Sequence, residues 1–154
     1  MLKTGDPAPD FSNPDADMNL VDLAQFRGKI LVLYFYMRDD TPGCTAEAIE
    51  FSELENAFSR ENAAVLGVSR DDCIKHGEFR DKHGISVRLL ADKEQVTCTA
   101  YGVLQDKEVD GVMRKSMVRS TFVIDKQGVI RHALYGVSSR GHAAEVLQLV
   151  KDLK

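Results

Sequence analysis

The stretch ILVLYFYMRDDTPGC, residues 30–44, decides the fold. Its first part, Ile30 to Tyr36, is a continuous apolar run rich in aromatic and branched side chains, which is typical of a strand buried on both faces. Thr41-Pro42-Gly43-Cys44 forms a turn, and from Thr45 to Asn62 apolar side chains recur near the spacing of a helix. The sequence therefore predicts a central strand, a turn and a long helix in this order.

Strands and helices continue to alternate along the rest of the chain. Predicted strands lie at Ala63–Ser69, Arg88–Leu90, Met117–Asp125 and Val129–Leu134, and predicted helices at Asp71–His83, Lys93–Tyr101 and Gly141–Lys154. The short segment 126–128 joins the last two strands and is typical of a hairpin loop. A parallel βαβ half followed by an antiparallel hairpin gives a mixed central sheet flanked by helices. The predicted class is α/β, and this order is compatible with a thioredoxin-like fold.

Length and composition favour a single domain that spans residues 1–154. The chain of 154 residues has a hydrophobic content of 44%, which is enough for one core, and no repeat, low-complexity tract or linker divides it. The formal net charge of -4 and the pI near 5.6 provide no large cationic field. Neither nucleic acid nor membrane lipid is therefore expected as a partner.

The cysteine, histidine and N-terminal patterns argue against secretion and against a metal site. The three cysteines, at positions 44, 73 and 98, do not form the pattern of a secreted disulfide scaffold. The four histidines are scattered, so no metal or other cofactor is expected. Residues Met1 to Pro7 lack the pattern of a signal peptide, and no later segment is apolar for long enough to span a bilayer. A cytoplasmic location is expected.

Cys44 is the candidate nucleophile because of its position at the start of the predicted helix. If Thr41 is the N-cap, Pro42 occupies the first helical position, where its missing N–H and fixed φ are harmless, and Cys44 lies in the first turn. Unpaired backbone amides and the positive end of the helix dipole favour a thiolate there. A cysteine at a helix start can equally be a small buried apolar residue. The local pattern leaves both interpretations open.

Two separated motifs resemble the signature stretches of peroxiredoxins. The first runs from Tyr34-Phe35-Tyr36 through DDTPGCTAE, residues 39–47, and the second is RSTFVID, residues 119–125. The similarity covers nearly the whole chain, from Gly5–Phe11 through LGVSRD at residues 66–71 and Tyr101–Val103 to the last helix. Within the peroxiredoxins, the chain is most similar to the peroxiredoxin Q subgroup, also called bacterioferritin comigratory protein.

The resemblance implies a thioredoxin-like fold and a thiol-dependent peroxidase for hydrogen peroxide and organic hydroperoxides. Cys44 would be the peroxidatic cysteine, which attacks the distal peroxide oxygen and becomes a sulfenic acid. Thr41 would offer its hydroxyl to the peroxide, Pro42 would shield the thiolate, and Arg119 would supply a permanent positive charge. Glu47, one turn after Cys44, would either orient Arg119 or occupy an exposed helix start.

A second thiol must reduce the sulfenic acid, and the chain departs from the subgroup at the positions that supply one. Many members carry a resolving cysteine five residues after the first, where this chain has Ile49, and others carry it at the position of Arg80. Cys73 lies about two turns before Arg80, on a similar helix face, and could resolve if the helix unwinds. Cys98 lies in an apolar helix and is interpreted as a core residue. Thioredoxin or another external thiol is the first expectation for the reductant, Cys73 the second and Cys98 the third.

Met37 is a further departure, since the subgroup commonly has proline at this position. Loss of the proline ring should make the following loop, residues 38–40, less rigid. The thioether of Met37 has two interpretations, an oxidisable group near the active site or a flexible gap-filler under the loop.

Other functions fit the sequence less well. A dithiol oxidoreductase of thioredoxin type would need a cysteine at the position of Thr41, and a cysteine hydrolase would need a histidine beside Cys44. From a different class, the alternative is a non-catalytic or chaperone-like binding module that has kept the thioredoxin fold. For the peroxidase, the expected partners are a peroxide substrate and a thiol reductant, and the expected state is a monomer or a weak dimer.

Overall fold

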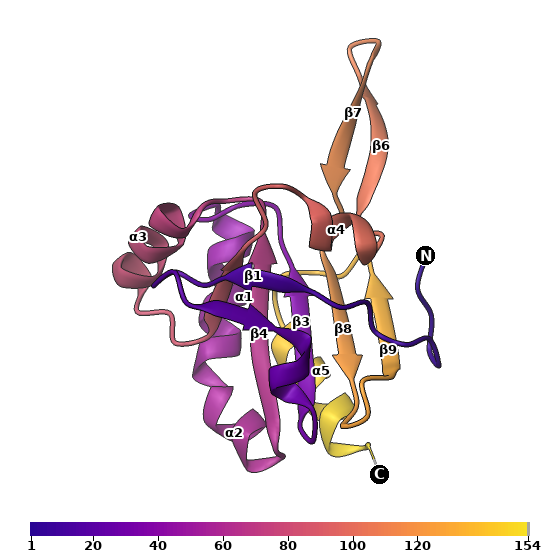
Figure 1. The fold of residues 1–154 in the computed structure, drawn as a ribbon. Coiled ribbons are helices and arrows are strands. Elements are labelled where there is room, and N and C mark those ends of the chain that lie inside the picture. Colours follow the sequence, from indigo (N-terminus) through magenta and orange to yellow (C-terminus); the bar gives the residue numbers. More distant parts are fainter. Residues whose placement is uncertain (154) are drawn as a thin grey trace.

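The computed structural model describes residues 1–153, and a five-stranded mixed sheet forms its centre (Figure 1). The strand order is β5-β4-β3-β8-β9, with parallel pairing on the β4 side of β3 and antiparallel pairing on the β8 side. These strands are β3 (Ile30–Phe35), β4 (Ala63–Ser69), β5 (Arg88–Ala91), β8 (Ser120–Ile124) and β9 (Ile130–Tyr135). The predicted mixed sheet is confirmed.

The strand β3 lies in the middle of the sheet because all of its side chains are apolar or aromatic and buried. Its alternate side chains point to opposite faces, so Val32 and Tyr34 join one core cluster while Leu33 and Phe35 join the other. Tyr34 pairs with Gly67 of β4, where an added Cβ would lie only 2.7 Å from the Tyr34 ring. Glycine at position 67 therefore makes room for this ring.

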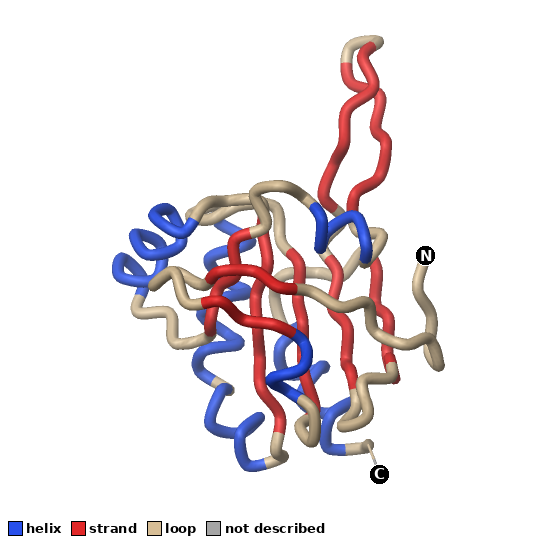
Figure 2. The backbone as a smooth tube through the Cα atoms, viewed as in Figure 1, coloured by secondary structure: helices blue, strands red, loops and turns tan. Residues whose placement is uncertain are grey.

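Helices and short elements cover both faces of the sheet (Figures 1 and 2). The helices α1, α2 and α5 pack on one face, and α3 lies along the β5 edge, while β1, β2, η1 and α4 cover the other face. The bounds of these elements are β1 (Ser12–Pro14), β2 (Leu20–Asp22), η1 (Leu23–Phe26), α1 (Pro42–Glu53), α2 (Glu55–Arg60), α3 (Cys73–His83), α4 (Val96–Ala100) and α5 (His142–Lys151). Within residues 1–153, none of the helices has the length and apolar character needed to cross a membrane.

The helix predicted at Thr45–Asn62 is two helices. It begins earlier than predicted, at Pro42, and it is interrupted at Leu54, whose φ of -96° and ψ of 2° do not continue the α-helix. A second short helix follows, and its last residue is Arg60. The start of the first helix is the part that matters for the site, because it places Cys44 in the first turn.

Two other helices are shorter than predicted at their N-termini. The side chain of Asp72 accepts a hydrogen bond from the backbone N–H of Lys75 at 2.8 Å, and this cap starts α3 at Cys73. Gln95 has a φ of 62°, so α4 begins only at the next residue. The predicted closing helix is also present, although its predicted last residue, Lys154, lies outside the described residues.

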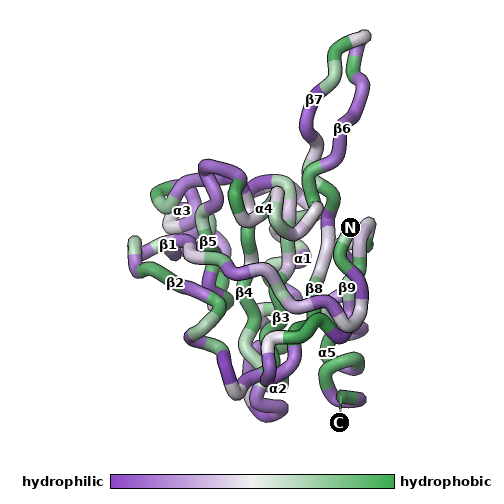
Figure 3. The backbone as a smooth tube through the Cα atoms, turned by 45° about the vertical axis from the view of Figure 1, so that its right-hand side comes forward, coloured by the Kyte–Doolittle hydropathy of each residue, from purple (hydrophilic) through white to green (hydrophobic). Residues whose placement is uncertain are grey.

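A second hairpin, which is not among the predicted elements, projects from the body of the molecule (Figures 1 and 3). It consists of β6 (Leu104–Val109) and β7 (Val112–Met117), joined by Asp110 and Gly111, both with positive φ. The predicted strand Met117–Asp125 is correspondingly shorter, because its first residue belongs to β7. Most side chains of the hairpin are exposed, so its strands carry no alternation of apolar and polar residues. The dipeptide Asp-Gly was the available signal.

Candidate active site

Cys44 lies in the first turn of α1, just beyond the end of β3 (Figure 1). Thr41 has the extended backbone of an N-cap, with φ -91° and ψ 152°, and Pro42 is the first helical residue. The placement of Thr41 at the N-cap and of Pro42 at the first helical position is therefore confirmed. The Thr41 hydroxyl, however, donates to the carbonyl of Arg38 at 3.1 Å and does not cap the helix. The Cys44 side chain is buried, with 2% of its surface exposed.

Arg119 reaches Cys44 because of the register between β3 and β8. Phe35 pairs with Ser120, so Arg119, the residue before β8, lies beside the residues that follow β3. Its Nη2 lies 3.3 Å from Sγ of Cys44, and its Nη1 donates to Oε1 of Glu47 at 2.6 Å. The structure thus brings together three residues that the sequence places in two separate motifs.

Glu47 is buried beneath this contact. Burial raises the pKa of its carboxyl to about 7, against the lowering effect of the Arg119 guanidinium. Burial also lowers the pKa of Arg119, but Glu47 and Cys44 outweigh that effect and raise it, so the guanidinium stays charged beside the sulfur. Of the two interpretations of Glu47, the contact with Arg119 is confirmed, and the exposed helix start is wrong because the side chain is 0% exposed.

Two further residues border the site although neither sequence motif points to a role for them. A Cβ on Gly43 would lie 3.3 Å from Nη2 of Arg119 and 3.3 Å from Oγ of Ser139, so Ser139 packs beside the first turn of α1. Tyr34 belongs to the same core cluster as Cys44. Burial, followed by the charge of Glu47, raises the pKa of the Tyr34 phenol. Alternate side chains of a strand lie on the same face, so the sequence of β3 could have predicted that Tyr34 faces α1. Nothing in the sequence around Ser139 predicts that it lies beside the site.

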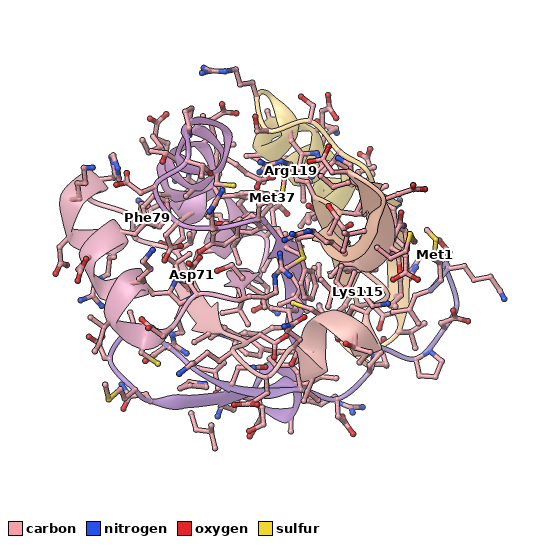
Figure 4. All side chains as sticks on the ribbon, turned by 90° about the horizontal axis from the view of Figure 1, so that it is seen from above. Met1, Met37, Asp71, Phe79, Lys115 and Arg119 are labelled. Carbon is pink, nitrogen blue, oxygen red and sulfur yellow. The ribbon has the colours of Figure 1, made fainter. Side chains whose placement is uncertain are left out.

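Met37 lies at the same end of the molecule as Arg119, and Figure 4 looks down on this end. In this view Met37 and Arg119 project onto the same region, with Phe79 of α3 to one side and Lys115 of the β6–β7 hairpin to the other. Met37 is 39% exposed, so it is not a fully buried residue. Its two interpretations, an oxidisable thioether near the site and a gap-filler under the loop, stay predictions.

The other two cysteines have surroundings that disfavour a thiolate. Cys98 is fully buried, as predicted for a core residue, and burial followed by its hydrogen bond with Asp92 raises its pKa. Cys73 is partly exposed, and burial, Asp72 and Asp15 together raise its pKa. Cys73 also lines a cavity of about 600 Å³ to which Cys44 does not contribute. All three cysteines are free thiols.

One group of side chains has the composition of a metal site. Ligand atoms of Asp39, Asp71 and His76 lie within 4.8 Å of one another. These atoms are already engaged in hydrogen bonds, since Nδ1 of His76 lies 2.6 Å from Asp39 and Oδ2 of Asp71 accepts from the Ser69 hydroxyl at 2.7 Å. The group is therefore a hydrogen-bond network that joins Asp39, in the loop before α1, to Asp71 and to His76 of α3.

The chain is similar to known proteins over most of its length. The AhpC/TSA family model matches residues 4–133. The chain is 38% identical over 152 residues to peroxiredoxin Bcp of Bacillus subtilis, which covers 99% of this chain and 97% of the relative. It is 34% identical over 151 residues to peroxiredoxin Bcp of Escherichia coli, with 98% and 97% covered.

Solved structures of similar proteins share the fold. A cysteine-to-serine mutant of Xylella fastidiosa PrxQ superposes with a TM-score of 0.92 at 34% identity, covering 98% of this chain and 96% of that chain. The Xanthomonas campestris bacterioferritin comigratory protein, described with its alkyl peroxide reduction activity, superposes with a TM-score of 0.89 at 33% identity, covering 92% and 90%.

The chain therefore belongs to the AhpC/TSA family, and it is a thiol-dependent peroxidase with a thioredoxin-like fold. Within that family it is a peroxiredoxin of the Q, or bacterioferritin comigratory protein, subgroup. These findings confirm the predicted family, fold and enzyme class, and they imply a peroxide substrate and a thiol reductant.

Proposed function

We propose that Cys44 carries the peroxidase reaction as a thiolate that attacks the distal oxygen of hydrogen peroxide or an organic hydroperoxide. The O–O bond breaks and Cys44 becomes a sulfenic acid, while the leaving hydroxide or alkoxide takes up a proton to form water or an alcohol. The single observation that carries this assignment is the 3.3 Å contact between Nη2 of Arg119 and Sγ of Cys44 at a helix start.

The surrounding residues have distinct roles in this proposal. The Arg119 charge stabilises the thiolate and the charge that develops on the peroxide, and Glu47 fixes the direction of the guanidinium. Backbone N–H groups of the first turn of α1, which have no acceptor within the helix, would stabilise the same charge. Pro42 shields the sulfur. The Thr41 hydroxyl donates to the carbonyl of Arg38 in the free enzyme, and it turns to the peroxide when the substrate binds.

A thiol from outside the chain completes the cycle. Its thiolate attacks the sulfur of the sulfenic acid, water leaves and a mixed disulfide forms; a second thiol of the reductant then releases Cys44 and carries the disulfide away. The raised pKa of Cys73 and of Cys98 supports this route, because a thiol in its neutral form is a poor nucleophile.

Thioredoxin, a small dithiol protein, or another cellular thiol fits this second step. The proposal includes a cytoplasmic setting with its pool of reduced thiols, and a monomer or weak dimer that needs neither nucleic acid nor membrane. The three scattered cysteines, which do not form the pattern of a secreted disulfide scaffold, support a reducing compartment.

The test is peroxide consumption with dithiothreitol as the reductant. Cys44→Ser should abolish turnover, because serine keeps the shape of the side chain but is not an anion at neutral pH. Cys73→Ser is the matched control, since it makes the same change at the first turn of α3, and it should keep the wild-type rate. Turnover retained in Cys44→Ser would remove Cys44 from the mechanism.

A further inference from the structure

The cavity of about 600 Å³ that Cys73 lines lies beyond the carboxyl ends of β4 and β5. Three segments enclose it, namely residues 10–14, which include β1, residues 72–73 at the start of α3, and residues 91–97, which lead from β5 into α4. In Figure 1, β1 crosses the molecule between α3 and α4. The volume lies in the range of sites that hold small organic molecules. The lining residues indicate which kind of molecule would fit.

The walls of this cavity are mainly apolar. Phe11, Pro14 and Ala91 contribute apolar side chains to it. Val96, the first residue of α4, also lines the cavity, although 69% of this residue is exposed to solvent. Covering apolar side chains with the apolar part of a ligand removes them from water, which is favourable. A ligand of this cavity therefore needs an apolar body.

Three buried polar side chains, those of Asn13, Asp92 and Thr97, fix the shape of the cavity. The Asn13 amide donates to the carbonyl of Ala91 at 3.0 Å, and the Thr97 hydroxyl donates to Oδ1 of Asn13 at 2.6 Å. The Asp92 carboxylate accepts from the backbone N–H groups of Thr97 at 3.3 Å and of Cys98 at 2.7 Å. These bonds join β1 to the turn after β5 and to α4. The cavity is therefore pre-formed, which favours binding because a ligand does not have to order the walls.

Acidic side chains outnumber basic ones around the cavity. Its lining residues include one lysine, Lys93, and four carboxylates, those of Asp10, Asp72, Asp92 and Glu94. Within residues 1–153, none of these four carboxylates forms an ion pair. Exposed aspartate and glutamate side chains are ionised at neutral pH. The cavity therefore attracts a cation and repels an anion.

Cys73 experiences this negative charge at the α3 side of the cavity. Burial raises the pKa of its thiol, and the charges of Asp72 and Asp15 raise it further. The carboxylates that disfavour a thiolate at this place would favour a cation there, for the same electrostatic reason. The side chain is partly exposed, so its alkylation can report whether the cavity is occupied.

We propose that this cavity is a second binding site of the chain, for an organic amine that carries a protonated nitrogen on an apolar body. The apolar body lies against Phe11 and Val96, and the ammonium group lies toward the unpaired carboxylates of Asp10 and Glu94. A small inorganic cation would leave the apolar walls uncovered, and a neutral apolar molecule would leave the carboxylates without a partner. The site does not include Cys44, so the proposal does not depend on the mechanism of the peroxidase.

Three probes with the same indole ring and two-carbon chain separate the effect of charge from that of apolar contact. At neutral pH tryptamine carries an ammonium group, tryptophol a neutral hydroxyl and indole-3-propionate a carboxylate. Binding is measured on the full-length, reduced wild-type chain as protection of Cys73 against N-ethylmaleimide, with peptide mapping by mass spectrometry. The probe concentration that halves the alkylation rate of Cys73 gives the dissociation constant. The alkylation rate of Cys44 in the same samples is the internal control.

Tryptamine should bind roughly tenfold more tightly than tryptophol, because hydrogen bonds between charged partners are stronger than those between neutral ones. Indole-3-propionate should bind more weakly than tryptophol, since its carboxylate is repelled by those of the cavity. With tryptamine at about ten times its dissociation constant, alkylation of Cys73 should slow roughly tenfold, because only the unoccupied fraction reacts. Cys44 should keep its rate.

A pair of substitutions tests the carboxylates directly. Asp10 and Glu94 are exposed and neither caps a helix, so Asp10→Asn combined with Glu94→Gln should leave the free energy of unfolding in urea unchanged. This double variant should bind tryptamine roughly threefold to tenfold more weakly than the wild type and tryptophol equally well. The matched control is Glu108→Gln combined with Asp110→Asn, which removes two charges from the exposed β6–β7 hairpin and should keep the wild-type affinity for tryptamine.

The proposal is overturned if tryptamine protects Cys73 no better than tryptophol does, or if the double variant at Asp10 and Glu94 keeps the wild-type affinity. Equal protection of Cys44 would overturn it as well, because the amine would then act outside the cavity. So would protection of Cys73 that increases with protein concentration without any probe, since a second copy of the chain would then occupy the cavity. If the double variant does not fold, the comparison of the three probes on the wild type decides.

Discussion

The starts of α1 and α3 are built alike but treat their cysteines in opposite ways. Each helix follows an extended N-cap residue, Thr41 or Asp72, and each carries a cysteine in its first turn. At α1 the nearest charged group is a guanidinium, 3.3 Å from Sγ of Cys44. At α3 the neighbours are carboxylates, and burial together with Asp72 and Asp15 raises the pKa of Cys73.

The comparison shows that a helix start alone does not make a cysteine reactive. The N-terminal amides and the dipole are present in both helices, and each favours an anion by a modest amount. The difference comes from side chains that other strands deliver, in particular Arg119 from the start of β8. The reactive site therefore depends on the pairing of β3 with β8, which brings Arg119 to Cys44, as much as on the helix that carries the sulfur.

Removing the Arg119 guanidinium should reduce the difference in reactivity between Cys44 and Cys73. Arg119→Met keeps much of the side-chain bulk without the charge, and it should slow peroxide reduction roughly 10²-fold, the usual size for one lost electrostatic contact at a reacting centre. Alkylation of Cys44 at a fixed neutral pH should also become slower, toward the rate of Cys73. The rate of peroxide consumption measures the first effect, and the rate of Cys44 alkylation measures the second. An alkylation profile that does not change with the substitution would refute this account of Arg119.

The buried carboxyl beneath the site should appear in the pH dependence of stability. Burial raises the pKa of Glu47 from 4.5 to about 7, so between these values the folded state holds this proton more tightly than the unfolded state. The quantity compared is the free energy of unfolding of the wild type minus that of Glu47→Gln. The contribution of Glu47 to this difference is fully present below about pH 4.5, and it is lost as the pH rises through about 7. The loss should be about 3 kcal/mol, given about 1.4 kcal/mol for each pKa unit.

Urea unfolding of both proteins at several pH values between 4 and 8 measures this loss. The wild-type curve should fall relative to that of Glu47→Gln as the pH rises. Parallel curves for the two proteins would mean that Glu47 does not hold its proton in the folded state.

The smallest expected effect is at α3, where the negative charge of Asp72 can be removed while its capping hydrogen bond is kept. Asp72→Asn keeps an oxygen that accepts from the N–H of Lys75 but lacks the charge beside Cys73. Alkylation of Cys73 at pH 8 should become about two- to fivefold faster, because less of the thiol is held neutral. Asp72→Ala is the control for loss of the cap. An unchanged alkylation rate in Asp72→Asn would assign the inertness of Cys73 to burial alone.

The sequence predicts the central elements well because they follow simple periodicities. The apolar run of β3 and the cap, proline and cysteine at the start of α1 are local patterns, and both are present as predicted. The β6–β7 hairpin was missed because its strands are exposed and show no apolar period. The sequence offers no local sign that Glu47 is buried, because its burial depends on an arginine that arrives from β8.

The same limit applies to the loop before α1. Asp39 and His76 are separated by 37 residues, and only the folded sheet brings them to 2.6 Å. In the sequence, His76 was one of four scattered histidines, and Asp39 was part of a motif that served to identify the family. Contacts between polar side chains that are far apart in the sequence leave no repeating pattern along the chain, so a single sequence cannot reveal them.

Peptide mapping of the oxidised wild-type chain tests the central claim most directly, namely that the two helix starts hold one reactive and one inert thiol. The protein is treated with one equivalent of hydrogen peroxide, trapped with a sulfenic-acid reagent, alkylated and analysed by mass spectrometry. The account predicts a trapped sulfenic acid on Cys44, with Cys73 and Cys98 recovered as free thiols. A peptide that links Cys44 to Cys73, together with loss of turnover in Cys73→Ser, would contradict it and make the chain a two-cysteine enzyme.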